Sequence, residues 1–403
     1  MLRTCAGTVS LVLWLLAGAA PASARTLVVD NDRAQCRTAE YRTIQAAIDA
    51  ADPGDRVSVC AGAYREQVFI HPELEGLVVE STPRRTATIL APKQFVEHPR
   101  LRAIVVAAAR HNVVRGFRIL GPLPPNPECN GAFTHDVGVQ IGAAFSLIED
   151  NQIYDIRDNC NKGGGIWSGD AQSELDLGLG GSDSVVRGNV IEQYRRFGII
   201  VENVAQGRPV RIVDNVIAGA QSRPTAGVIA GQESLVHVEG NFVHSNSSVG
   251  ISLSGNFTGD HVARDNRVRG NTIGIRASSD GGSYISGNDV SASRASGIEV
   301  GWTDSPGHVV NNISRDNVGH GIDVLANPRG GVVSANQSLR NRGDGIRIDG
   351  GAGIQIDGNT ALGNLGVDCR DLSGPFGTGT AGTFNFWTAN KGRTSSPAGL
   401  CRP

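Results

Sequence analysis

Four charged residues recur in the C-terminal half at intervals of 23 or 24 residues: Arg276, Glu299, Asp323 and Arg347. If the fold brings them into one line, the two neighbouring carboxylates form an acid/base pair, because proximity of like charges raises the pKa of one of them. Carboxylates so placed are also ligands that Ca²⁺ accepts. The flanking arginines add groups suited to holding the carboxylate of a ligand. The chemistry therefore depends on whether the chain repeats in space as it does in sequence.

A repeat of the required length runs through the second half of the chain. Asparagine recurs every 22 to 26 residues, at Asn189, Asn215, Asn241, Asn266, Asn288, Asn312, Asn336 and Asn359. About ten residues after most of these, a glycine-isoleucine pair opens an apolar run, at Gly198-Ile199, Gly250-Ile251, Gly274-Ile275, Gly297-Ile298, Gly321-Ile322 and Gly345-Ile346. Gly165-Ile166 precedes them.

A period near 24 that contains short runs of alternating apolar residues predicts one coil of a parallel β-solenoid. Stacked coils lie about 4.8 Å apart, so identical side chains stand above one another and inward asparagines pass hydrogen bonds from coil to coil. Glycine before isoleucine allows a sharp turn where a Cβ would crowd the next coil. The fold class is all-β, in one domain, since a solenoid grows by adding coils.

Composition narrows the partners. The chain has 53 Gly, one Met and 5% aromatic residues, which fits stacked Val/Ile strands and tight turns. Its formal net charge of −2 gives no basic footprint for nucleic acid. We expect a monomer.

The first 24 residues are typical of a secretory signal, with Arg3, an apolar run from Leu11 to Ala17, and Ala22-Ser23-Ala24 as the cleavage site. The mature chain would begin at Arg25 and be exported, to the periplasm, the cell surface or the medium, without a transmembrane segment. It would contain six cysteines, an even number in an oxidising compartment. Sequence proximity favours Cys36–Cys60, Cys129–Cys160 and Cys369–Cys401, although six cysteines allow 15 pairings.

The ends of the solenoid require protection, because open coils expose unpaired backbone. Thr43, Ile44, Ala47, Ile48 and Ala51 predict a short amphipathic helix that covers the N-terminal end. We expect the cap and first coil in 25–70, the repeat coils in 71–373, and a C-terminal cap in 374–403 held by Cys401. Two insertions, Gly121–His135 and Ser168–Ser184, interrupt the repeat and are places where binding residues collect.

The opening resembles a known superfamily. Tyr41-Arg42-Thr43-Ile44-Gln45-Ala46-Ala47-Ile48, then Asp52-Pro53-Gly54-Asp55-Arg56-Val57, then Gly62-Ala63-Tyr64-Arg65-Glu66 are similar to the start of pectate-lyase-like β-helix proteins. The resemblance covers nearly all of 25–403 and implies a right-handed, single-stranded parallel β-helix. It does not define an activity, since enzymes, adhesins and accessory proteins share this architecture.

Specific catalytic motifs of the superfamily are incomplete. The Asp-Pro-His motif of alginate epimerases has its nearest string at Thr134-His135-Asp136, and of the polygalacturonase set only Gly319-His320-Gly321 is present. His320 is therefore retained as a catalytic candidate, beside the alternative that it simply fills the repeat position of Ser296 and Asp344.

The alternation of the Gly-Ile strands places one residue of each coil on the outer face: Gln140, Trp167, Ile200, Ser252, Arg276, Glu299, Asp323 and Arg347. We call this series the outer column. Trp302 would follow as a sugar-stacking platform. A rival cleft would join Trp167 to Tyr194, Arg195 and Arg196 beside the acidic residues Asp170 and Asp176. The alternative interpretation of the column is a solvated sheet face with charges paired between coils.

Two functions remain open at this stage. The first is an exported protein that binds an acidic polysaccharide and processes it as a lyase or epimerase. For this function the resemblance implies proton abstraction beside the sugar carboxylate. The candidates for the base are Arg276, Arg347, His320 and Tyr194, and Glu299 and Asp323 would supply the acidic pair or Ca²⁺ ligands. The second is a non-catalytic surface scaffold or carbohydrate-binding accessory protein, favoured by the incomplete motifs.

Overall fold

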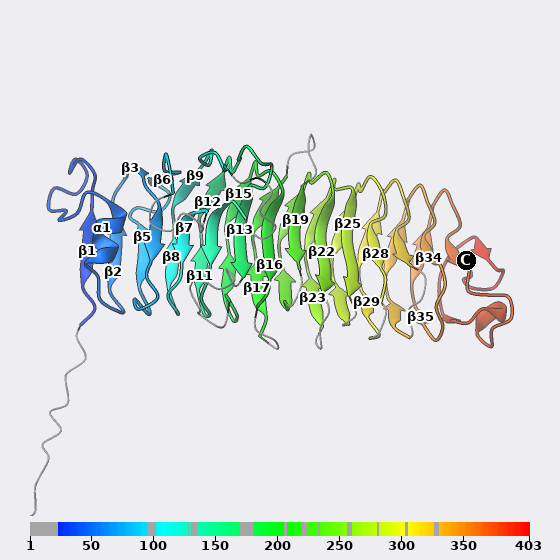
Figure 1. The fold of residues 1–403 in the computed structure, drawn as a ribbon. Coiled ribbons are helices and arrows are strands. Elements are labelled where there is room, and N and C mark those ends of the chain that lie inside the picture. The colour runs from blue at the N-terminus through cyan, green and yellow to red at the C-terminus, as the bar shows by residue number, and fades with distance from the viewer. Residues whose placement is uncertain are drawn as a thin grey trace, which may run out of the picture.

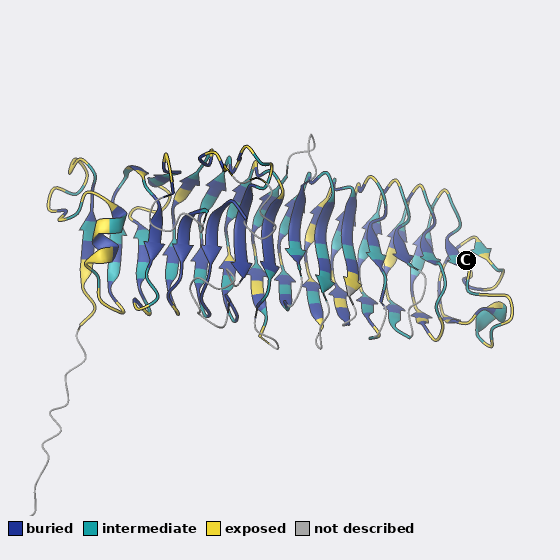
Figure 2. Ribbon diagram, viewed as in Figure 1, coloured by how far each residue is buried: buried dark blue, intermediate teal, exposed yellow. Residues whose placement is uncertain are grey.

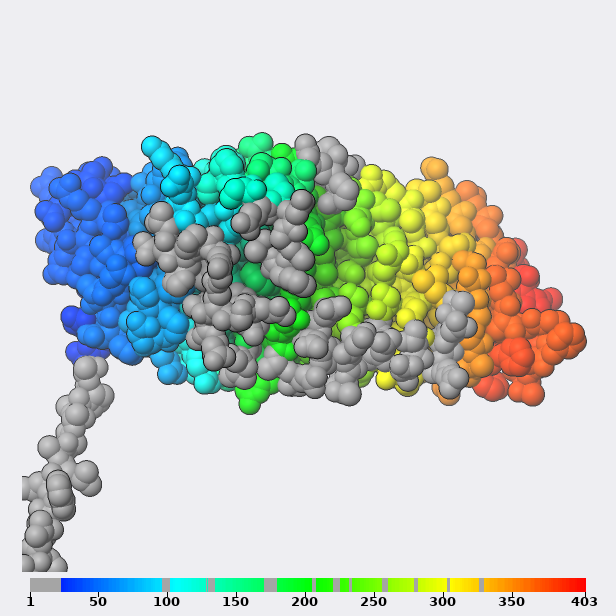
Figure 3. Space-filling view, in the orientation of Figure 1, coloured from blue at the N-terminus to red at the C-terminus, as the bar shows by residue number. Residues whose placement is uncertain are grey.

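The chain winds into a single elongated coil of parallel strands (Figure 1). The computed structural model describes residues 23–95, 102–127, 129, 135–169, 180–204, 208–219, 225–231, 234–255, 260–279, 282–302, 305–325 and 330–403. Strands follow one another in the order sheet A, sheet B, sheet C, and the coils are stacked along one axis from the blue N-terminal end to the red C-terminal end (Figure 3).

Among the described residues, every strand between the ends of its sheet pairs in parallel with its counterparts in the preceding and following coils. Within the described residues, sheet A has 14 strands: β1 (Thr26–Val29), β2 (Arg56–Val59), β5 (Val78–Ser81), β8 (Val113–Arg115), β11 (Leu147–Glu149), β14 (Val185–Arg187), β17 (Val210–Val213), β20 (Val236–Glu239), β23 (His261–Arg264), β26 (Ser283–Ser286), β29 (His308–Val310), β32 (Val332–Ser334), β35 (Gln355–Asp357) and β38 (Phe386–Thr388).

The described part of sheet B has 12 strands: β3 (Gly62–Arg65), β6 (Ala87–Leu90), β9 (Arg118–Leu120), β12 (Gln152–Tyr154), β15 (Val190–Glu192), β18 (Val216–Ala218), β21 (Phe242–His244), β24 (Arg267–Arg269), β27 (Asp289–Ser291), β30 (Ile313–Arg315), β33 (Gln337–Leu339) and β36 (Thr360–Leu362). That of sheet C has 13: β4 (Val68–Ile70), β7 (Ala103–Ala107), β10 (Val137–Ile141), β13 (Gly164–Gly169), β16 (Phe197–Glu202), β19 (Ala226–Ala230), β22 (Val249–Gly255), β25 (Ile273–Ser279), β28 (Ile298–Val300), β31 (Ile322–Val324), β34 (Ile346–Ile348), β37 (Cys369–Asp371) and β39 (Ser395–Ser396).

The core is a stack of aliphatic side chains inside the coil. Ile275, Ile298, Ile322 and Ile346 are paired in register on successive strands of sheet C, and all four are fully buried. Figure 2 shows the strands as mainly buried and the turns as the more exposed parts. Because each coil covers its neighbour, the apolar side chains of one coil leave water only when the coils are stacked.

The predicted asparagine ladder is confirmed and is longer than the repeat indicated. Each buried amide accepts hydrogen bonds from the preceding coil, as when Asn312 donates through Nδ2 to Oδ1 of Asn336 at 3.0 Å and Asn336 donates to Asn359 at 2.9 Å. The ladder runs from Asn151 to Asn390. It lies at the turn between sheets A and B, where it pairs amides that would otherwise be buried without partners.

A second ladder, not predicted from the sequence, lies at the turn that follows sheet B. Asn246 donates to Asn271 at 3.0 Å, and Asn317 donates to Asn341 at 2.9 Å. Ser293 occupies the intervening coil, and its backbone N–H donates to Asn317.

Glycine before isoleucine is required at the entry to sheet C. A Cβ on Gly274 would lie 2.2 Å from Cγ1 of Val290 and 2.5 Å from the carbonyl oxygen of Gly297. The second contact is with backbone of the next coil, which cannot move aside without breaking the stack.

Helix α1 (Ile44–Asp49) covers the N-terminal end, as predicted. The Thr43 hydroxyl caps it by accepting from the Ala46 N–H, and its inner face buries Ile44, Ala47 and Ile48. At the other end, β38 and β39 add the last strands to sheets A and C. Thr380, in the 3-10 turn η1 (Thr380–Gly382), donates to and accepts from the backbone of Trp387 in β38.

The three disulfides expected from sequence proximity are formed: Cys36–Cys60, Cys129–Cys160 and Cys369–Cys401. Residues 1–22, which contain most of the expected signal, lie outside the described residues, as do parts of both insertions. Among the helices that the structure describes, none is long and apolar enough to cross a membrane.

Candidate functional site

The outer column exists in the register that the repeat predicts. Sheet C pairs Arg276 with Glu299, Glu299 with Asp323, and Asp323 with Arg347. The structure adds two members that sequence reasoning missed: Ile229 lies between Ile200 and Ser252, and Arg370 follows Arg347. Charged groups therefore occupy five consecutive coils at a spacing of about 4.8 Å.

The column changes character along the axis. In the N-terminal half, the outward side chains form a second apolar cluster separate from the interior core, composed of Phe69, Ala103, Val106, Ala108, Val137, Trp167, Phe197 and Ile200. From Ser252 onward the outward residues are polar or charged and partly exposed, except for the buried Asp323. A polar ligand would therefore meet the C-terminal half of sheet C.

Each carboxylate of the column faces an arginine. Arg276 Nε lies 2.8 Å from Glu299 Oε1, and Arg347 Nη1 lies 3.3 Å from Asp323 Oδ1. Arg347 also contacts Asp349 at 2.8 Å. The arginine side chains keep 39% and 23% exposure at 276 and 347, so both guanidinium groups remain accessible from solvent.

Asp323 is the most perturbed of these groups. Its side chain is only 6% exposed. Burial raises the pKa of the Asp323 carboxyl, His320 and Arg347 lower it, and Glu299 and Asp349 raise it further. A carboxyl whose pKa is raised in this way can hold or release a proton closer to neutral pH than an exposed aspartate.

His320 lies beside this group, but its ring is already committed. The Asp344 backbone N–H donates to Nδ1 of His320 at 2.9 Å, which leaves the proton of the neutral imidazole on Nε2. The Asp344 carboxylate in turn forms an ion pair with Arg370, whose Nε lies 3.0 Å from Oδ2. In this arrangement His320 offers an N–H donor, whereas the expected role as a base would require the Asp344 hydrogen bond to break.

Trp302 is not a sugar-stacking platform, and that expectation was wrong. Its side chain is 1% exposed, and Nε1 donates to the Ser283 hydroxyl at 2.8 Å. The indole lies against Gly307 and Gly331, where an added Cβ would come within 2.0 and 2.7 Å of the ring. The chain turns inward after β28, so the alternation of the strand no longer predicts the direction of the side chain.

The rival cleft is not assembled either. Tyr194 is 2% exposed and points inward, where its hydroxyl donates to Oδ1 of Asn246 at 2.5 Å as part of the second ladder. Burial raises the pKa of the Tyr194 phenol, and it has no access to a ligand as a base. Arg195 is half-buried and Arg196 is exposed. Asp170 and Asp176 lie outside the described residues.

Trp167 is directed outward, as predicted, yet only 6% of it is exposed. The His135 ring packs edge-on against Trp167 and Phe197, with centroids 5.0 and 5.1 Å apart. His135 Nε2 also lies 2.6 Å from Glu202 Oε1. Sequence reasoning missed this pair, because 67 residues separate its members and His135 lies in an insertion outside the repeat.

In the part of the chain that the structure describes, no group of three or more His, Cys, Asp or Glu side chains could hold a metal ion. Ca²⁺ at Glu299 and Asp323 therefore stays a prediction.

Comparisons with known proteins place this geometry in a fold class. Residues 198–361 match the family model described as "Right handed beta helix region". The chain is a right-handed parallel β-helix protein, which confirms the fold that the resemblance implied.

Solved structures agree on the fold. The chain is similar to the periplasmic alginate epimerase AlgG, with 11% identity, a TM-score of 0.52, and 85% of this chain and 77% of that chain covered. It is similar to XylC, solved in complex with xylose, with 11% identity, a TM-score of 0.52, and 86% and 76% covered. No match was found among curated proteins. At these identities the likeness shows the fold alone.

Proposed function

We propose that this protein is exported and binds an acidic polysaccharide along the outer face of the C-terminal half of sheet C. The observation that carries the proposal is the outer column itself, in which Arg276 and Arg347 flank Glu299 and Asp323 on consecutive coils. The guanidinium groups of both arginines are partly exposed. The regularly spaced carboxylates of a polymer can therefore displace Glu299 and Asp323 as their partners. Three disulfides support export, because they persist in oxidising compartments.

Processing of that polymer is the finer part of the proposal. The buried Asp323 carboxyl, with its raised pKa, is the group suited to proton transfer beside a sugar carboxylate. An arginine would hold that carboxylate, and His320 Nε2–H would donate to the developing negative charge. In a lyase, ionised Asp323 would take the C5 proton, the bond to the O4 substituent would break, and the leaving oxygen would take a proton from water. In an epimerase, Asp323 would take the C5 proton and water would return a proton to C5 from the opposite face.

A non-catalytic binding protein is the second candidate, and a specific observation favours it. Every carboxylate of the column already faces an arginine, as expected of a sheet face whose charges are paired between coils. The two candidates differ in what the carboxylates do: an enzyme needs them, whereas a binding protein needs only the arginines.

Paired substitutions separate these roles. Arg276→Ala with Arg347→Ala should weaken binding of an acidic polysaccharide by at least about tenfold, because charge-assisted contacts are lost. Arg264→Ala with Arg315→Ala, on the outer faces of sheets A and B, is the matched control and should leave affinity unchanged. If both pairs of substitutions lower the affinity equally, the loss reflects only the change in net charge, and the outer column is not the binding site.

Activity is tested on a panel of uronic-acid and neutral polysaccharides, with and without Ca²⁺. Absorbance detects unsaturated products, reducing ends detect hydrolysis, and NMR detects epimerisation. Glu299→Gln with Asp323→Asn should abolish turnover while keeping or increasing affinity, since it removes two negative charges. Glu192→Gln with Asp289→Asn, on the outer face of sheet B, is the control. Turnover that survives the column substitution would exclude these carboxylates from catalysis.

A further inference from the structure

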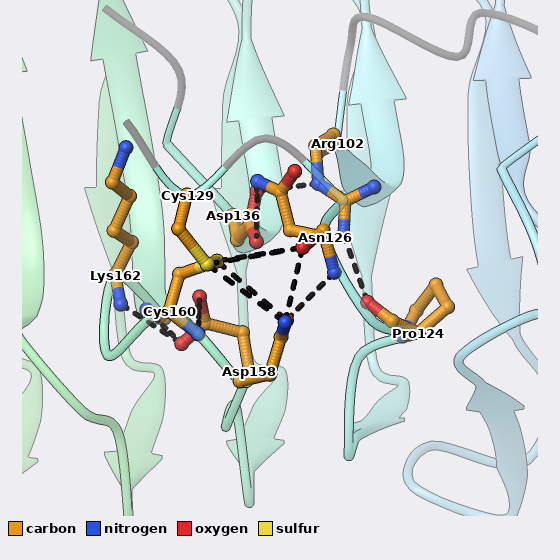
Figure 4. The surroundings of a disulfide bond; sticks show 10 residues. Arg102, Pro124, Asn126, Cys129, Asp136, Asp158, Cys160 and Lys162 are labelled. Carbon is orange, nitrogen blue, oxygen red and sulfur yellow. Dashed lines mark hydrogen bonds and ion pairs between the residues drawn. A yellow bond between two sulfur atoms is a disulfide. The ribbon is translucent and has the colours of Figure 1, made fainter. Parts of the chain in front are cut away.

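A cavity of about 790 Å³ opens at the N-terminal half, on the side where the chain enters sheet C. It lies beside the Cys129–Cys160 disulfide, which joins the two segments that precede β10 and β13 (Figure 4). Its described lining consists of Lys93, Gln94, Phe95, Arg102, Pro124, Pro125, Asn126, Pro127, Cys129 and Asn159. These include two cations, an aromatic ring and three prolines, but no carboxylate.

Arg102 is held in a fixed position at this cavity. Its Nε donates to Asp136 at 2.7 Å and its Nη2 donates to the Pro124 carbonyl at 2.8 Å, as Figure 4 shows. The guanidinium carbon lies 5.1 Å from the centre of the Phe95 ring. A guanidinium fixed on a ring is preorganised to receive an anion, because little side-chain freedom is lost on binding.

Two carboxylates lie beneath the cavity. Asp158 accepts hydrogen bonds from the backbone N–H groups of Cys160, Lys162 and Gly163. Burial raises the pKa of the Asp136 carboxyl, Arg102 lowers it, and Asp158 raises it. Asp136 pairs with the Arg102 guanidinium through Nε, and Lys93 adds a second cation to a described lining that has no carboxylate.

We propose that this cavity is a second binding site, which takes one carboxylated sugar residue. The carboxylate would lie between Lys93 and Arg102, and the sugar ring would pack on Phe95 and the prolines. The proposal rests on the proposed function for its ligand class. From β7, which follows Arg102, to β25, which carries Arg276, there are six coil steps, or about 29 Å at 4.8 Å each. A long polymer can therefore occupy the cavity and the outer column together, which increases its apparent affinity.

The scarcity of lysine gives a direct test. The chain contains only Lys93, Lys162 and Lys391. Reductive methylation with ¹³C keeps their charge and gives each a separate NMR signal. Titration with a hexuronic acid monosaccharide should shift the Lys93 signal in a saturable way, while Lys391, in the C-terminal segment, stays in place. Lys93→Arg assigns the signal. A Lys93 signal that moves no more than that of Lys391 would overturn the proposal.

Affinity for long chains is the second readout. Lys93→Ala should weaken binding of the long polysaccharide by about tenfold, and Lys93→Arg should restore it, because arginine keeps the charge. Arg42→Ala, at the exposed N-terminal cap, is the matched control. No loss in Lys93→Ala while the column arginines still matter would overturn the second site and leave the proposed function intact. The opposite result is also informative. If Arg276→Ala with Arg347→Ala leaves polymer binding unchanged but the Lys93 signal still shifts in a saturable way, the cavity is supported as a binding site and the outer column is not.

Discussion

The backbone N–H of Asp344 donates to Nδ1 of His320 across two adjacent coils, at 2.9 Å. Stacking at constant register makes this contact possible, since both residues occupy the same position of the repeat. The hydrogen bond fixes the tautomer of a histidine that sits beside the carboxyl of Asp323. His320, which the Gly-His-Gly motif suggests as a catalytic base, therefore presents Nε2–H as a hydrogen-bond donor.

The tautomer can be observed directly. In long-range ¹H–¹⁵N spectra of the protein labelled on histidine, the neutral imidazole of His320 should show Nδ1 unprotonated and Nε2 protonated. His320→Gln assigns the signal among the nine histidines. A proton on Nδ1 would contradict the hydrogen bond from Asp344 and would restore His320 as a candidate base.

The asparagine ladder should resist truncation strongly. In Asn312→Ala, the buried backbone N–H of Asn288 loses its acceptor, and the carbonyl oxygen of Ile285 loses the Nδ2 donor of Asn312. Each unpaired buried group costs about 1–3 kcal/mol, so we expect the free energy of unfolding to fall by about 2–4 kcal/mol. Urea unfolding followed by circular dichroism measures the change. Gln337→Ala, an exposed residue of the next coil, should change it by less than about 0.5 kcal/mol; a similar loss in both would deny the ladder its role.

The same burial bears on two apparent glycosylation sites, Asn312-Ile313-Ser314 and Asn336-Gln337-Ser338. Both asparagines are buried, and each Nδ2 that would carry the glycan donates within the ladder. Folded protein secreted from a eukaryotic host should therefore carry no glycan at either position. Peptide mapping by mass spectrometry decides the matter, and an occupied Asn312 in the folded fraction would contradict the ladder.

The sequence predicted the fold and the register of the outer column because stacking is a periodic process. Once Gly274-Ile275 and its equivalents are aligned, every residue of those strands is placed, which is why Arg276, Glu299, Asp323 and Arg347 line up as expected. The second ladder was also visible in principle. It repeats five residues after the first, as in Asn241 with Asn246 and Asn266 with Asn271.

Residues at turns and insertions were not predictable in the same way. Trp302 occupies space left by Gly307 in the same turn and by Gly331 one coil further on, and Tyr194 replaces an asparagine of the second ladder with a hydroxyl. The contact between His135 and Glu202 joins an insertion to a strand two coils away in sheet C. Such contacts depend on where a loop folds in space, for which a repeat contains no information.

His261 should make the protein sensitive to acid. It is fully buried at the start of β23, and neither ring nitrogen has a hydrogen-bond partner. Burial, together with the charge of the nearby His237, lowers its pKa from 6.5 to about 4. Because the folded pKa lies below the unfolded value, the unfolded chain takes up the proton first. The stability is therefore complete above about pH 6.5 and falls as the pH drops toward 4, by about 3 kcal/mol in all.

Comparison with a variant isolates this contribution from that of the carboxylates. Urea midpoints measured at pH 7.5, 5.5 and 4 should converge or cross for the wild type and His261→Leu, since the variant loses packing at every pH but has no imidazole to protonate. His111→Gln, at an exposed histidine, should follow the wild type throughout. The wild type and His261→Leu could instead lose stability in parallel between pH 7.5 and 4. Protonation of the buried His261 imidazole would then cost the folded state nothing, and His261 would not limit the acid stability of the solenoid.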